Sequence, residues 1–461
     1  MKGRLLITMC LIIIVIQYSA LCQSNDELNG EGKRWNITFS TESIETILLD
    51  PESILENPDL FWETDGAYIL SSMWHKNYKV SLDDKNYYEN WKSYLAELAA
   101  IPKEERNNNE GFKLVEAIKK RIPLFYEKGL PAIDAFLPEN SLKFSTTVFI
   151  TNKTYSFAFM TNTRIVMDPL SYYFNKDPDR IFNTLAHECF HIGYGINRYL
   201  REETELENGY IYNTMLDALQ NEGMATYFGY TLQNIFPAPD IPDYILLENP
   251  ADVKRLFADV NRLFSTAENL TADSLQKASW KTGVVNRGYY IVGAFMSKTI
   301  EDKLGHEALV KTIAIGPLNF VDTYNRLVED EMKVYAFKKP TGKTLLQQLK
   351  SAVFDENKTE FIRVADDITR LKEELPSNAQ SNIERIGYGM MYKERYEWAV
   401  SIFTLNADLF HESANAWDCL AEAYLTAGDI DSATKYYRHA LAVDPTFSNA
   451  ILMLEKIEKM K

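Results

Sequence analysis

Two histidines and a glutamate stand at a spacing that suits a metal ion. His187, Glu188 and His191 form the pattern HExxH. On a helix, residues four apart lie about one turn apart on the same face, so both imidazoles can reach one ion while Glu188 lies beside it. The chain has only six His, and chance gives this pattern about 0.006 times in a sequence of this composition. The spacing therefore predicts a zinc ion with a bound water, and hydrolytic chemistry.

The sequence around this motif favours a buried helix. Asp177 can cap the first turn, Pro178 suits the first helical position, and Gly193 is expected to end the run. An apolar stripe lies between them, formed by Ile181, Phe182, Leu185, Ala186 and Phe190. The alternative is two buried histidines packed against apolar neighbours. It is the weaker interpretation, because two imidazoles and a carboxylate in such a stripe need partners, which a metal would supply.

A catalytic zinc site needs a third protein ligand and an open position for water. The long form of the motif places a third His six residues after the second, but that position is Asn197. A carboxylate is the better candidate, and Glu222 lies on a predicted amphipathic helix. The neighbouring Gly223 is costly in a helix, which indicates close packing there. Asp217 is a fallback ligand. Thr226, one turn after Glu222, either orients a ligand or is a plain surface threonine.

The pairing of HExxH with a downstream helix that carries Asn-Glu-Gly-x-Ala resembles the gluzincin branch of zinc metallopeptidases. The stretch from Phe144 to Phe320 more closely resembles a family described as zinc-dependent peptidases. The resemblance implies that His187, His191 and Glu222 bind Zn2+. It also implies that Glu188 is the general base, which takes a proton from a water acidified by zinc and returns it to the leaving amine.

The resemblance further implies a Tyr or His near the substrate oxyanion. Tyr290, in the segment RGYYIVGAF, matches that place, and Tyr289 competes with it. Because the chain holds 27 tyrosines, a plain core or surface tyrosine remains the alternative interpretation of either residue.

The N-terminus has the layout of a secretory signal peptide. Lys2 and Arg4 precede a run from Leu5 to Ile16 that is apolar except for one Thr, followed by small and polar residues. Twelve residues are too short to span a bilayer comfortably, and no later stretch is long and uncharged enough to try. We expect cleavage after Cys22 and export to the periplasm or the extracellular space. Lipid attachment at Cys22 ranks second, because Leu21 is a poor neighbour for it.

The chain divides into a signal peptide (1–22), a helical N-terminal region (23–140), a zincin-like metallopeptidase domain (141–370) and a C-terminal module (376–461). Residues 143–150, 155–160 and 164–167 are short and rich in aromatic and β-branched residues, so they predict a small antiparallel sheet just before the motif helix. We therefore expect an α+β fold that is predominantly helical. The sheet offers a strand on which an extended peptide can lie, or serves only as scaffold.

The C-terminal module carries a repeat with a period of 34 residues. The first copy aligns with the second through the pairs Ile383 and Trp417, Ile386 and Leu420, Gly387 and Ala421, Ala399 and Ala433, and Phe403 and Tyr437. This pattern resembles the tetratricopeptide repeat (TPR), although the first copy lacks the usual residues at Met390, Asn406 and His411. Such repeats either bind a protein partner on a concave surface or cap the neighbouring domain.

Composition narrows the classes of partner. The formal net charge of -16 argues against nucleic acid and against anionic membrane surfaces. After removal of the signal peptide, Cys189 and Cys419 lie in different segments, so a disulfide framework is not expected. Two functions remain. The favoured one is an exported zinc metallopeptidase that acts on a peptide or protein, and the alternative is a noncatalytic TPR interaction protein whose metal site is vestigial or structural.

Overall fold

The computed structural model describes residues 34–62, 64, 66–67, 85–140, 142–151, 158–161, 164–201, 210–335 and 344–460. The predicted signal peptide, with Cys22, and the first half of the strand expected at 155–160 lie outside these residues. Within the described part of the chain, no helix is both long enough and apolar enough to cross a membrane.

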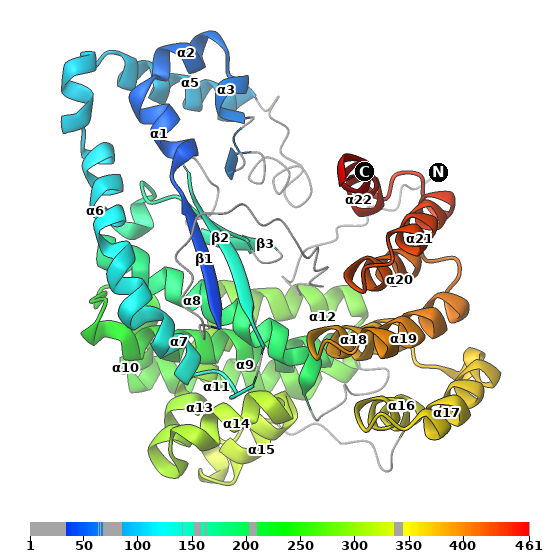
Figure 1. Cartoon of the computed structure of the whole chain (residues 1–461). Coiled ribbons are helices and arrows are strands. Elements are labelled where there is room, and N and C mark those ends of the chain that lie inside the picture. The colour runs from blue at the N-terminus through cyan, green and yellow to red at the C-terminus, as the bar shows by residue number, and fades with distance from the viewer. Residues whose placement is uncertain are drawn as a thin grey trace, which may run out of the picture.

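A four-stranded sheet lies at the centre of the molecule (Figure 1). Its order is β1 (Trp35–Ser40), β2 (Phe144–Ile150), β4 (Arg164–Met167) and β3 (Ala158–Thr161). The pairs β1–β2 and β2–β4 are parallel, and only β3–β4 is antiparallel. The expected antiparallel sheet is therefore wrong, although the three expected strands are present.

The error has a physical cause. β2 and β4 are buried along nearly their whole length, as strands of parallel sheets commonly are. The chain reverses into β3 after β2 and reverses again into β4, which returns the chain to the direction of β2. β1 comes from a region predicted to be mostly helical and pairs with a strand about a hundred residues later. A long-range pairing of this kind leaves no local signal in the sequence.

The motif helix is α8 (Pro178–Asn197). Asp177 caps it as expected, since its Oδ1 accepts a hydrogen bond from the backbone N–H of Asp179 at 2.9 Å. The prediction that Gly193 ends the helix is wrong, because α8 continues for one more turn. Gly193 is required for packing instead: a Cβ at this position would lie 2.2 Å from Cδ1 of Leu137.

Two long helices cross at a pair of glycines. α9 (Tyr210–Thr231) and α13 (Gly288–Leu304) meet where Gly223 faces Gly293. A Cβ on Gly223 would lie 2.3 Å from Cα of Gly293, and a Cβ on Gly293 would lie 2.1 Å from the carbonyl oxygen of Leu219. The close packing expected at Gly223 is thus confirmed, and its partner is the backbone of α13.

The remaining helices of the first 335 residues surround the sheet and these three helices in one continuous hydrophobic core. N-terminal to the motif helix they are α1 (Glu42–Leu49), α2 (Pro51–Glu56), α3 (Asp59–Trp62), α5 (Lys85–Ala99), α6 (Glu110–Leu124) and α7 (Leu130–Ala135). C-terminal to α9 they are α10 (Pro242–Glu248), α11 (Pro250–Thr266), α12 (Ala272–Ser279), α14 (His306–Ile315) and α15 (Pro317–Asn325).

The C-terminal helices stack along one side of the molecule, coloured yellow to red in Figure 1. They are α16 (Leu345–Phe354), α17 (Lys358–Arg370), α18 (Ala379–Tyr392), α19 (Tyr396–Leu409), α20 (Ala414–Thr426), α21 (Ile430–Val443) and α22 (Ser448–Met460). The pairs α18–α19 and α20–α21 coincide with the two predicted repeat copies. Small residues permit close packing in the second copy, where Ala421 and Ala433 are fully buried.

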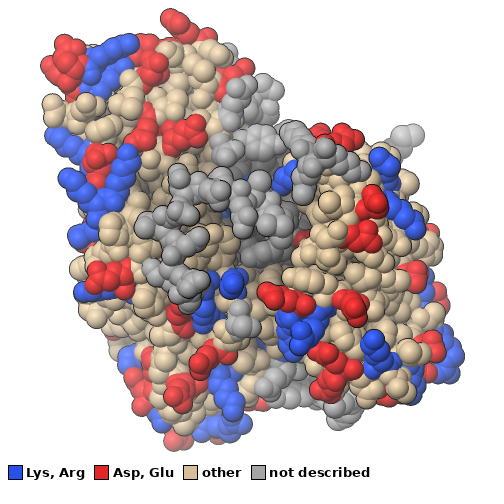
Figure 2. All heavy atoms as spheres, in the orientation of Figure 1, with Lys and Arg blue, Asp and Glu red and all other residues tan. Residues whose placement is uncertain are grey.

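Positive and negative side chains are mixed on the surface. Figure 2 shows Lys and Arg side chains interspersed with Asp and Glu side chains, and no extended basic surface among the described residues on the face in view. A nucleic acid would need such a surface.

Candidate metal centre

The two motif histidines face each other on α8. Their Nε2 atoms lie 3.0 Å apart. The Nδ1 atom of His191 lies 2.9 Å from Oδ1 of Asn221, and the ring of His187 hydrogen-bonds the backbone of Ala225. Because an amide oxygen only accepts, His191 donates through Nδ1, which leaves its Nε2 lone pair directed at the other ring. Two such nitrogens at this distance repel each other unless a proton or a cation lies between them.

Glu222 of α9 completes the cluster. Its Oε2 lies 3.4 Å from Nε2 of His191 and 3.8 Å from Nε2 of His187. Tetrahedral zinc, with ligand bonds of about 2.0–2.1 Å, holds neighbouring ligand atoms roughly 3.3 Å apart. The three measured separations bracket this value. Two neutral nitrogens and one carboxylate oxygen are also a donor set that zinc favours, so the residues fit the ion.

The charges of the cluster are tightly coupled. Burial lowers the pKa of His187, and the charge of His191 lowers it further. Burial alone would also lower the pKa of His191, but Glu222 outweighs it and raises that pKa. In the same way, burial opposes the charge on Glu222, yet His191 and then His187 hold the pKa of Glu222 below its usual value. The site therefore favours an ionised carboxylate facing positive charge.

Glu188 lies beside this cluster on α8 and is partly buried. No hydrogen bond joins its carboxylate to another described residue. Burial raises the pKa of Glu188 to about 7. The charge of His191 opposes this increase, and the charge of Glu222 adds to it. A carboxylate in this position and environment can take up a proton near neutral pH.

The two competing tyrosines have different surroundings. Tyr289 is fully buried, and its hydroxyl lies 2.7 Å from Oγ of Ser279, so it belongs to the core. Tyr290 is partly exposed and lies within the electrostatic reach of Glu222, which adds to burial in raising the pKa of Tyr290. Of the pair, Tyr290 is therefore the one near the cluster.

Asp217, Thr226 and Cys189 are not part of the cluster that could hold a metal. Asp217 accepts a hydrogen bond from Nη1 of Arg201 at 2.6 Å and is not part of the group of residues that could hold a metal. Thr226 is buried, and its hydroxyl has no hydrogen-bond partner among the described residues. Cys189 is buried and unpaired, and burial raises the pKa of its thiol far above the usual range, which makes it inert.

Three residues near the cluster were not predicted. Asn221 directly precedes Glu222 in the Asn-Glu-Gly pattern, so this pattern is the sequence signal that indicates it. Arg287 also stands in a quoted segment, directly before Gly288. Asp243, which binds Arg287, lies on a short helix in another part of the chain, and nothing in the local sequence indicates it.

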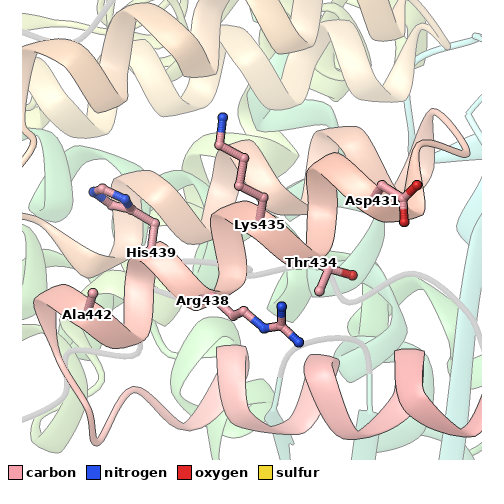
Figure 3. Close-up of a pocket in the computed structure, with 6 residues that line it drawn as sticks. All are labelled: Asp431, Thr434, Lys435, Arg438, His439 and Ala442. Carbon is pink, nitrogen blue, oxygen red and sulfur yellow. The ribbon is translucent and has the colours of Figure 1, made fainter.

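An open depression of about 530 Å³ lies on the repeat module and has no part in the metal centre. Figure 3 shows the residues that line it, all on α21: Asp431, Thr434, Lys435, Arg438, His439 and Ala442. Their side chains fan out instead of converging, with Lys435 and Arg438 pointing in opposite directions (Figure 3). Such an arrangement does not form a binding site.

Comparison with known proteins agrees with this geometry. A family model described as "Putative zinc dependent peptidase (DUF5700)" matches residues 60–333, which is more than half of the chain and contains the whole metal cluster. A tetratricopeptide repeat model matches residues 414–457, which span α20, α21 and most of α22. No significant match was found among curated proteins or solved structures.

Proposed function

Because the chain belongs to this zinc-dependent peptidase family, we propose that it hydrolyses peptide bonds with one zinc ion held by His187, His191 and Glu222. The observation that carries the proposal is the convergence of the two Nε2 atoms and the Glu222 carboxylate, with Glu188 beside them. The ligand pattern is of the gluzincin type. When bound, zinc would lower the pKa of a water molecule and polarise the scissile carbonyl.

Three side chains then transfer the proton, stabilise the oxyanion and orient a ligand. Glu188 accepts the proton of the attacking water and donates it to the leaving amine. Tyr290 donates a hydrogen bond from its hydroxyl to the oxygen of the scissile carbonyl as negative charge develops there. Asn221 fixes the His191 ring, so that Nε2 remains directed at the ion.

The sheet suggests where an extended peptide would bind. β3 is one of the two edge strands of the sheet, and it lies in contact with α8. An edge strand has unpaired backbone groups to which an extended segment can add as a further strand. We therefore propose that the substrate is a peptide or an extended protein segment that lies along β3.

The N-terminus and the repeat module suggest where the protein acts and what it binds. We infer from Lys2, Arg4 and the apolar run Leu5–Ile16 that the protein is exported. Residues 414–457 match the tetratricopeptide repeat, and stacked helical repeats form concave binding surfaces, so we propose that the module binds a protein partner. A noncatalytic interaction protein remains the alternative function, and the same repeats favour it.

The test compares the zinc-loaded protein with the variant Glu188→Gln. A mixture of peptides is incubated with each protein, and cleavage is followed by mass spectrometry while zinc content is measured in parallel. We expect the variant to keep stoichiometric zinc and to lose cleavage by 10²-fold or more. Glu307→Gln, an exposed glutamate of α14, is the matched control. Full zinc without any Glu188-dependent cleavage would favour the interaction protein.

A further inference from the structure

Arg287 is unusual in its backbone. It lies between a π-helical turn, Trp280–Val285, and the start of α13, with φ at 63°. Residues with a Cβ rarely adopt this left-handed conformation, because the side chain crowds the backbone there. Such strain persists only where the surrounding contacts hold the residue in place.

The side chain of Arg287 supplies those contacts. Its Nε donates a hydrogen bond to Oδ1 of Asp243 at 2.8 Å, and its Nη2 donates to Oδ2 of the same carboxylate. The guanidinium also lies over the ring of Tyr290, with Cζ 3.2 Å from the ring centroid. The planar group thus connects a carboxylate at its edge with the phenol ring at its face, an arrangement that lysine cannot reproduce.

Asp243 is itself fixed relative to the metal centre. Its neighbour Tyr244 is buried and donates a hydrogen bond to Oδ1 of Asn183 at 2.5 Å. Asn183 lies on α8, one turn before His187, and its Nδ2 donates to the carbonyl of Gly229 on α9 at 2.8 Å. The helix that carries Asp243 is therefore attached to both helices that supply the metal ligands.

We propose that Arg287 and Asp243 are positioning residues for Tyr290. They restrict the phenol ring to one orientation, from which its hydroxyl donates a hydrogen bond to an oxyanion bound at the metal cluster. Arg287 also adds positive charge near the cluster, where it lowers the pKa of His187 and of Glu222, so the test must separate this charge from the geometry of the contacts. This inference rests on the proposed function, because it assigns Tyr290 its role in that reaction.

The experiment measures an oxyanion ligand directly, so that it does not depend on finding a substrate. Acetohydroxamate, a small zinc-binding oxyanion, is titrated into the zinc-loaded full-length protein by calorimetry. We expect Tyr290→Phe and Arg287→Gln each to weaken binding about 10- to 100-fold, the loss expected for one hydrogen bond to a charged group. The double variant should be no weaker than Tyr290→Phe within about threefold, because both changes remove the same bond.

Two further variants separate geometry from charge. Arg287→Lys keeps the charge but loses the bidentate and stacked contacts, so it should weaken binding as much as Arg287→Gln. Asp243→Asn should show a similar loss. The matched controls are Arg262→Gln, which removes an exposed pair with Asp259, and Tyr230→Phe, which removes an exposed hydrogen bond to Glu248. Both controls should bind like the unaltered protein.

The affinities of Arg287→Lys and of the double variant decide whether Arg287 positions Tyr290. Full affinity in Arg287→Lys, or losses that multiply in the double variant, would overturn the positioning role. Thermal unfolding and zinc content are measured for every variant, and Arg287→Lys provides the comparison if Arg287→Gln is unstable. If the coupled losses are found but no peptide is cleaved by the unaltered protein, the proposed function fails while the positioning of Tyr290 stands.

Discussion

At the scale of single residues, the metal centre depends on contacts that its ligands make away from the ion. The hydrogen bond between Nδ1 of His191 and Asn221 holds the ring in the tautomer that leaves Nε2 available. Asn221 is adjacent to Glu222, so one short stretch of α9 provides both a proposed ligand and the support for His191, another proposed ligand.

The first prediction concerns Asn221→Ala. Removal of the amide leaves the His191 ring free to turn and its N–H without a partner, so zinc affinity should fall about 10- to 100-fold. Competition against a chelator of known affinity measures the change. Asn269→Ala, at an exposed position, is the control and should bind zinc normally. Unchanged affinity in Asn221→Ala would show that the ring is held by other contacts.

The second prediction concerns Glu222→Gln. The substitution keeps the size of the side chain but removes the negative charge, so both zinc affinity and peptide hydrolysis should fall, in contrast to Glu188→Gln, which spares the metal. Zinc content after dialysis and cleavage rates at saturating zinc separate the two effects. A Glu222→Gln protein that retains zinc as firmly as the unaltered protein would remove Glu222 from the ligand set.

At the scale of elements, the features that were predicted correctly are those that local sequence signals determine. The beginning of α8 follows from Asp177 and Pro178, and Glu222, expected from a carboxylate beside a glycine in a helix, lies with the two histidines. What failed was set by distant contacts. Gly193 lies inside α8 because Leu137 fills the space that a side chain would need there, and the direction of β4 depends on its pairing with β2. No local pattern encodes either fact.

The third prediction tests the crossing of α9 and α13. Gly223→Ala places a methyl group against the backbone of Gly293, which cannot move aside as a side chain would. We expect a loss of about 1–3 kcal/mol in the free energy of unfolding, together with weaker zinc binding, because Glu222 is displaced with its helix. Chemical denaturation and chelator competition measure the two quantities.

The control for this prediction is Gly305→Ala. A Cβ there meets no atom within 4 Å, but φ is +89° and ψ is 164°, so the variant should lose about 1–3 kcal/mol through backbone strain alone. Its zinc affinity should remain normal. Weakened zinc binding in Gly305→Ala would mean that any loss of stability disturbs the site, and the effect of Gly223→Ala would then carry no information about the crossing.

At the scale of the whole molecule, the repeat module contains buried acids without basic partners in hydrogen-bond contact. Asp418 accepts a hydrogen bond from Nδ2 of Asn449 at 2.8 Å, and Glu422 accepts one from the hydroxyl of Tyr388 at 2.7 Å. Burial raises the pKa of Asp418 to about 7 and that of Glu422 to about 8, against the opposing effect of these hydrogen bonds. Both acids are thus neutral in the folded module at mildly acidic pH.

The fourth prediction follows from the sign of these shifts. The folded state holds the two protons more tightly than the unfolded state, so the stabilisation is complete below about pH 4 and is lost as pH rises through 7 to 8. The double variant Asp418→Asn with Glu422→Gln should flatten this decline by several kcal/mol, because each acid holds its proton well above its usual pKa in the folded state. Denaturation between pH 4.5 and 8 measures it. The exposed pair Asp408→Asn with Glu412→Gln should leave the slope unchanged, and an equal slope in both double variants would contradict the prediction.

The glycine pair also limits how the protein can move. Since the backbones of α9 and α13 touch at Gly223 and Gly293, Glu222 and Tyr290 travel together as one rigid body. If the substrate lies along β3 as proposed, room for a bulky chain comes from displacement of β3 and not from separation of α9 and α13. A cross-link introduced between α9 and α13 should therefore leave turnover intact, whereas one that joins β3 to α8 should arrest it.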